Sequence, residues 1–150
     1  ILPDETIVLT LIQSLCEGDF IPMKNYMREQ EGNKENINIL NIMCSILDFL
    51  SRRESPLFTH VAITLVNTIR STIHGPCREN QRYLVMNTEV LVCINRLMRS
   101  SRPKTHVLTV AWNKDVETLK ACVVDLLRSH QYSQDFDLCG SSLSWESCLC

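Results

Sequence analysis

The chain has 150 residues, 45% of them hydrophobic, and a formal net charge of -2. This length predicts one folded domain. The balanced charge gives no reason to expect nucleic acid as a partner, and four glycines with five prolines are too few for a many-stranded β fold. No apolar run approaches the roughly 18 residues that span a bilayer. The chain begins at Ile1 and its first charged residues are acidic, so we expect a piece of a longer protein without a signal peptide.

Two helices are predicted at the start of the chain. In residues 4–17 the apolar side chains recur at helical spacing, and Gly18 follows as a residue that can close the helix. Pro22 suits the first turn of a second, short helix. The polar residues 31–35 are predicted to form a loop.

Residues 36–52 predict a third helix with a large apolar surface. Its polar positions recur every three or four residues and form one narrow stripe: Asn38, Asn41, Ser45, Asp48 and Arg52. A surface helix needs only a single apolar stripe, yet nearly every other position here is apolar. We therefore expect this helix to be covered on most sides, as the inner helix of a layered stack.

A fourth helix is predicted to begin at Ser55 and Pro56, an N-cap followed by a first helical residue, and to end near His74. Its apolar side chains share one face: Phe58, Val61, Ala62, Leu65, Val66, Ile69 and Ile73. The connection from the third helix is short, which favours antiparallel packing of the two.

A helix-to-helix corner is predicted directly afterwards. Gly75 can adopt the left-handed conformation that ends a helix, and Pro76 suits the first position of the next one. Asn80 and Gln81 are then expected in the first turns of that helix, where their amides can satisfy backbone groups that helix ends leave without partners.

The rest of the chain continues the helical pattern. A short helix breaks near Asn87, and Asn87 or Thr88 caps a further helix. The last predicted helix covers residues 107–130, and residues 132–150 are expected to be a poorly ordered tail. We therefore predict an all-α domain over residues 1–131, an armadillo-like antiparallel helix stack (an α-solenoid segment) of about six helices.

Residues that could carry catalytic or metal chemistry are scattered. The four histidines lack ligand spacing, and the sequence has no phosphate loop, dinucleotide fingerprint or EF-hand pattern. We expect no cofactor, no metal and no catalytic residues. Cys44, Cys93 and Cys122 lie in apolar helical segments, which predicts buried, reduced thiols and a cytosolic compartment. Cys77 lies at a helix start, which could lower its pKa, but a packed thiol is the favoured interpretation.

A local basic run follows the second helix after the corner. Arg96, Arg99, Arg102 and Lys104 have no acidic neighbour in the sequence. One interpretation is a solvated helix end, where cations complement the helix dipole. The other is a docking patch for an acidic partner.

Three blocks of the sequence together resemble a known family. The corner Gly75-Pro76-Cys77-Arg78-Glu79-Asn80-Gln81 looks like the signature of the RIH-associated domain of inositol trisphosphate receptors and ryanodine receptors, the intracellular calcium-release channels. Residues 11–17 with 24–30 are similar to the opening helices of that domain, and residues 36–50 agree more weakly. Within the corner, the matching residues are Gly75, Pro76, Cys77, Glu79, Asn80 and Gln81. The resemblance covers residues 9–130. The connector at 52–56 is shorter than in the large channels, and the tail does not match.

The resemblance implies a non-catalytic segment between the ligand-binding part and the pore of such a channel. It also implies a position on the cytoplasmic face of the endoplasmic reticulum membrane, without direct membrane contact. The expected partners are neighbouring helical domains of the same or adjacent subunits in a tetrameric parent. The family's ligand-binding residues lie outside this domain, so none is assigned here. The alternatives are a free-standing cytosolic helical adaptor without a pore and, as a third hypothesis, a cysteine-dependent enzyme.

Overall fold

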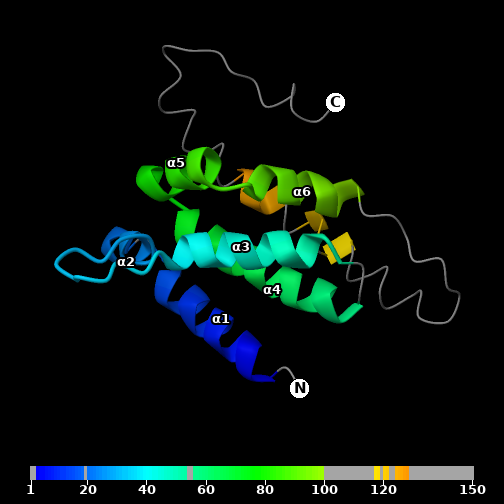
Figure 1. Ribbon diagram of the computed structural model, residues 1–150, viewed down its shortest axis with the longest axis horizontal. Helices are drawn as coiled ribbons and strands as arrows, with labels where there is room; N and C mark the ends of the chain where they lie inside the picture. Colours follow the sequence, from blue (N-terminus) through cyan, green and yellow to red (C-terminus); the bar gives the residue numbers. More distant parts are fainter. Residues whose placement is uncertain are drawn as a thin grey trace, which may run out of the picture.

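The computed structural model describes residues 3–18, 20–53, 56–99, 117–118, 120–121 and 124–128. All regular structure in these residues is helical, as Figure 1 shows. The labelled helices are α1 (Pro3–Cys16), α2 (Ile21–Tyr26), α3 (Ile39–Ser51), α4 (Pro56–Ile73), α5 (Arg78–Asn87) and α6 (Val90–Arg99). The predicted all-α class is confirmed for the described part of the chain, whereas the superhelical repeat of an armadillo solenoid stays a prediction.

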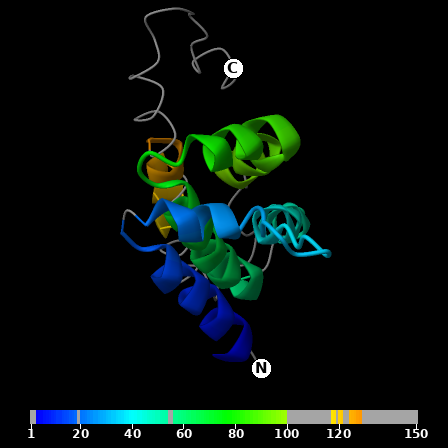
Figure 2. The same cartoon turned by 90° about the vertical axis from the view of Figure 1, so that its left-hand side faces the viewer.

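Helix α4 is the centre of the stack. Helices α1, α2, α3 and α5 all pack against it, and α6 packs on α3. Leu65, Val66 and Ile69 of α4 are completely buried. Thr68 is also buried, and its hydroxyl donates to the carbonyl of Thr64 at 2.8 Å, so its polar atom has a partner inside the core. Figures 1 and 2 show the other helices arranged around α4 on several sides.

Helix α3 runs in the opposite direction to α4, as the short connector predicts (Figure 1). It is not, however, the covered inner helix that its composition indicates. Leu40 and Leu47 are buried, but Ile42, Ile46 and Phe49 are 47%, 41% and 51% exposed. The reason is that α4 and α6, the helices that contact α3 most, leave part of its apolar surface exposed.

The helix boundaries follow local capping chemistry. Gly18 has φ +83°, as expected of a residue that closes α1. Asn38 accepts a hydrogen bond from the amide of Asn41 at 2.8 Å and so caps α3. Helix α4 begins at Pro56, as predicted, while the predicted cap Ser55 lies outside the described residues. The hydroxyl of Thr88 accepts from the amide of Val90 at 3.4 Å, at the start of α6.

The cysteines inside helices are packed thiols. Cys44 and Cys93 are buried and free, as predicted, and Cys16 is buried as well. Burial raises the pKa of Cys44 to about 12 and that of Cys93 to about 11. Both thiols are therefore neutral at physiological pH. Cys122 lies outside the described residues.

The last predicted helix can be followed only in part. The described residues between 117 and 128 are helical. Leu126 is buried in the same core cluster as α3, α4 and α6, and Asp125 pairs with Arg70 of α4 at 3.4 Å. The predicted tail, residues 132–150, lies outside the described residues. In the part of the chain that is described, no helix is both long and apolar enough to cross a membrane.

Candidate functional site

The corner between α4 and α5 has the left-handed glycine that the sequence predicts. Helix α4 ends at Ile73, and Gly75 has φ +81°, a conformation that costs glycine little and a β-branched residue much. The amide of Cys77 donates to the carbonyl of Gly75 at 2.8 Å and tightens the turn. The sequence predicts Pro76 as the first residue of the next helix. The structure differs: α5 begins at Arg78, and Cys77 occupies the N-cap position.

Side chains satisfy the carbonyls at the end of α4. An α-helix leaves its last four carbonyls without internal partners. Asn80 Nδ2 donates to the carbonyl of Thr72 at 3.1 Å. Gln81 Nε2 donates to the carbonyls of Ile73 at 2.7 Å and Gly75 at 3.0 Å. The two side-chain amides thus bond to helix-end carbonyls as predicted, and these bonds join α5 to the end of α4.

A buried lysine completes this cap. Lys24 of α2 is 1% exposed, and its Nζ donates to the carbonyl of His74 at 2.8 Å. The residues bonded in this way are 50 positions apart in the sequence. A cation at the C-terminal end of a helix also complements the negative end of the helix dipole. Helix α2 is therefore joined to the corner through one charged side chain.

Asn80 joins three parts of the chain. Besides its bond to α4, Asn80 Nδ2 donates to the carbonyl of Lys24 at 2.7 Å. Its Oδ1 accepts from Nε of Arg28 at 3.0 Å. Asn80 has no exposed surface; its bonds to Lys24 and Thr72 are buried, and its bond to Arg28 is partly buried. Both donor positions and the acceptor of the amide are used, and neither an aspartate nor an alanine could replace them all.

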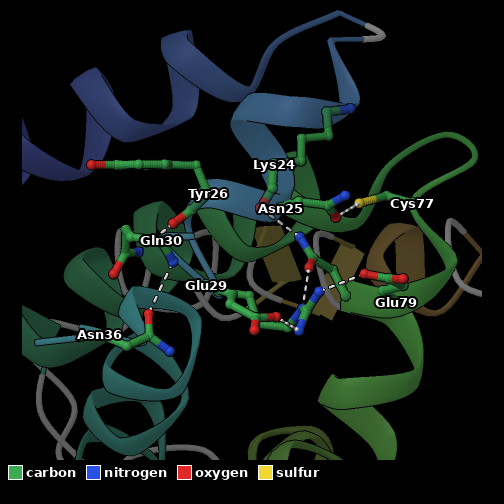
Figure 3. A network of polar contacts seen from close by, with 10 residues as sticks. Lys24, Asn25, Tyr26, Glu29, Gln30, Asn36, Cys77 and Glu79 are labelled. Carbon is green, nitrogen blue, oxygen red and sulfur yellow. Dashed lines mark hydrogen bonds and ion pairs between the residues drawn. The ribbon is translucent and has the colours of Figure 1, made fainter. Parts of the chain in front are cut away.

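Arg28 carries the network to the surface. Its Nη2 pairs with Glu79 at 2.6 Å and its Nη1 with Glu29 at 2.9 Å. Both carboxylates are more than half exposed, so the ion pairs add little stability by themselves. They hold the guanidinium plane in the orientation that lets Nε reach Asn80. Figure 3 shows Glu79 and Glu29 in the lower part of this network, with Lys24 and Asn25 above them.

The thiol of Cys77 is part of the packing. It is 1% exposed, and its Sγ lies 3.5 Å from Oδ1 of Asn25 (Figure 3). Burial raises the pKa of Cys77, which keeps the thiol protonated at neutral pH. This favours the packed-thiol interpretation over a reactive nucleophile.

The network also reaches α3 through the loop after α2. Gln30 is buried; its side-chain amide donates to the carbonyl of Tyr26 and its Oε1 accepts from the amide of Ile37 at 2.8 Å. The amide of Gln30 donates to Oδ1 of Asn36 at 3.0 Å (Figure 3). These bonds connect the two ends of the loop between α2 and α3. The amide of Leu40 in α3 donates to the carbonyl of Met27 at 3.2 Å, so hydrogen bonds connect the corner, α2 and the start of α3.

The structure changes the interpretation of the predicted basic patch. Arg96 does have an acidic neighbour in space: its Nη1 lies 3.0 Å from Oδ1 of Asp48, and it donates to the hydroxyl of Ser51 at 2.6 Å. Hydrogen bonds from Arg52 and Arg96 lower the pKa of Asp48 to about 2. Arg96 therefore fastens α6 to α3. Arg99 is exposed, and Arg102 and Lys104 lie outside the described residues.

Two residues of the network escape the sequence reasoning. Lys24 and Arg28 lie in a segment that resembles the family, but charged residues in a short helix suggest only a solvated surface. The usable signal is helical spacing: Lys24 lies three residues before Met27 and four before Arg28, which puts both charged residues on the same side as Met27, a buried side chain that is 4% exposed. Among the described residues, no group of three or more histidines, cysteines and carboxylates could hold a metal ion.

Comparison with known proteins agrees with the corner motif. The search of solved structures found no match to this chain. The family model described as RyR and IP3R Homology associated matches residues 5–98, which is more than half of the chain. The match includes α2, the corner and α5, the elements that the network joins. The chain therefore belongs to the RyR and IP3R Homology associated family.

Proposed function

We propose that this chain is a non-catalytic helical segment of an intracellular calcium-release channel of the inositol trisphosphate and ryanodine receptor type. It would couple the cytosolic ligand-binding regions to the pore. The observation that carries the proposal is the family match over residues 5–98. That family is associated with receptors and channels and is not a known enzyme family.

The corner network supports this role physically. A segment that transmits a conformational change needs parts that move as rigid units between two arrangements. Lys24, Arg28 and Asn80 bind α2, α4 and α5 to one another with hydrogen bonds of 2.7–3.1 Å. If α2 moves, these hydrogen bonds then require the end of α4 to move with it.

The proposal includes a place in the cell and an assembly. The segment would lie on the cytoplasmic face of the endoplasmic reticulum membrane, as part of a larger protein. Its partners would be neighbouring helical domains of the same or an adjacent subunit in a tetramer. Calcium signalling is the process it would serve.

The test is calcium release by the full-length parent protein. It would be expressed in cells that lack both receptor types, and release from the endoplasmic reticulum would be measured in permeabilised cells after addition of inositol trisphosphate or of calcium. Arg28→Ala removes the guanidinium that bonds Asn80. We expect ligand binding to remain and release to fall, because coupling is lost while the ligand site is intact.

Arg82→Ala is the matched control, since Arg82 is exposed on α5. It should release calcium like the wild type. A parent protein that gives no ligand-dependent release in this system would refute the channel role. Equal release by wild type and Arg28→Ala would refute the coupling role of the corner.

A free-standing helical adaptor is the alternative. The observation that favours it is the uncovered apolar face of α3, with Ile42, Ile46 and Phe49 about half exposed. Such a face suits a protein that binds other proteins. An adaptor would bind partner proteins in the absence of any pore-forming part. Its parent protein would then give no ligand-dependent calcium release in the same cells, while purification of the parent would recover bound proteins.

A further inference from the structure

An apolar groove lies between α1 and α3. Both helices pack on α4, which also contributes lining residues. The groove has a volume of about 810 Å³. Val8 lines it from α1, Ile42, Ile46 and Phe49 from α3, and Phe58 and Leu65 from α4. No charged residue is among the described residues that line it.

The walls of this groove are exposed large side chains. Val8 is 57% exposed, and the three α3 residues are about half exposed. Soluble proteins rarely leave such contiguous apolar surface open without a use for it. The groove lies away from the corner network, which involves α2, the end of α4 and α5. It is therefore a separate surface.

The shape of the groove selects the kind of occupant. Two helices resting on a third leave a trough in which the side chains of a fourth helix can interdigitate. A lipid bilayer is flat on this scale and cannot enter a concave trough. An apolar trough without lining charges fits the apolar stripe of an amphipathic helix, with contacts spaced every three or four residues.

One end of the groove carries a positive charge. The guanidinium of Arg53 lies over the ring of Phe49, 3.6 Å from the ring centre. Arg53 follows the C-terminal end of α3, and its side chain is exposed. A cation held on an aromatic face at the edge of an apolar surface favours a carboxylate on whatever docks there.

We propose that the groove between α1 and α3 binds an amphipathic helix of a protein partner, and that this helix places an acidic side chain beside Arg53. The apolar stripe of the helix contacts Ile42, Ile46 and Phe49. The acidic residue sets the direction in which the helix lies. This docking goes beyond the proposed function and does not depend on a pore.

Peptide display on the whole 150-residue chain tests the proposal. The probe is a library of helical peptides of about 18 residues, or five turns. All members share an apolar stripe, and the ends vary between acidic and basic residues. We expect the enriched peptides to be acidic at one end. Ile46→Asp should weaken their binding about tenfold or more, because the new carboxylate would be buried without a partner against the apolar stripe of the peptide.

Val92→Asp is the matched control, since Val92 is 53% exposed on α6 and does not line the groove. It should bind the peptides like the wild type. Arg53→Glu should reverse the charge preference, so that peptides with a basic end are enriched. Circular dichroism checks the folding of each variant, and if Ile46→Asp does not fold, the charge reversal at Arg53 decides alone.

The outcomes that overturn the proposal are distinct. No enriched peptide, or equal binding by wild type and Ile46→Asp, would show that the groove binds no helix. A dimer of the chain that Ile46→Asp dissociates would make a second copy the occupant. Binding to phosphatidylcholine vesicles that is lost in Ile46→Asp would make lipid the occupant. None of these results bears on calcium release, so failure here is distinguishable from failure of the proposed function.

Discussion

Asn80→Ala should destabilise the fold more than the loss of one hydrogen bond suggests. The side chain has no exposed surface and takes part in bonds to the carbonyls of Lys24 and Thr72 and to the guanidinium of Arg28. Alanine leaves two buried carbonyls without a donor, and each such group costs about 1–3 kcal/mol. We expect a loss of about 2–4 kcal/mol in the free energy of unfolding, a large share of the 5–15 kcal/mol typical of a domain.

Urea unfolding followed by circular dichroism measures this loss, with the free energy extrapolated to water. Asn87→Ala makes the same substitution at an exposed position of the same helix and should cost less than about 0.5 kcal/mol. The double variant with Arg28→Ala should lose less than the sum of the two single variants, because both act on one network. If Asn80→Ala and Asn87→Ala cost the same, the corner is not held as described.

Three further predictions concern backbone, pH and thiols. Gly75→Val should cost about 1–3 kcal/mol in the same unfolding assay, because valine resists φ +81°; a neutral effect would contradict the left-handed corner. The pKa of Asp48 is about 2 when folded and about 3.9 when unfolded, so its contribution to stability is present above pH 4 and is lost as the pH falls towards 2. The free energy of unfolding of Asp48→Asn should therefore fall less steeply than that of the wild type as the pH is lowered from 4 towards 2. Identical pH dependence in the two proteins would contradict the pairing of Asp48 with Arg52 and Arg96. Cys44 and Cys93, with pKa values of about 12 and 11, should resist iodoacetamide at pH 8 until urea is added, as peptide mapping by mass spectrometry would show; rapid native labelling would mean that these helices open.

Local chemistry made the corner predictable. Gly75 can be assigned a left-handed conformation because the residues around it, an apolar helix before and a proline after, leave few alternatives. The role of Asn80 and Gln81 follows from the same reasoning, since helix ends need side-chain partners nearby. Their partners within eight residues were accessible to sequence reasoning. The bond from Lys24, 50 residues away, was not.

Tertiary placement decided the remaining cases. Periodicity shows that α3 is apolar over most of its surface, but it cannot show how many neighbours the helix has, and Ile42 and Phe49 are exposed as a result. For the same reason the sequence shows no acidic neighbour for Arg96, although Asp48 lies 3.0 Å from it across the α3–α6 contact. Pairs of opposite charge 48 residues apart leave no local pattern.

The cap on α4 has a consequence for how the molecule opens. The carbonyls at a helix end are usually solvated, and the last turn then frays on its own. Here the carbonyls of Thr72, Ile73 and His74 are held by side chains of α2 and α5. The last turn of α4 cannot fray unless both other helices detach, and α2, with six residues, is too short to persist alone. Amide hydrogens in α2 and in the final turn of α4 should therefore exchange with solvent at one common rate, as a single cooperative unit, and not in order of their distance from a helix end.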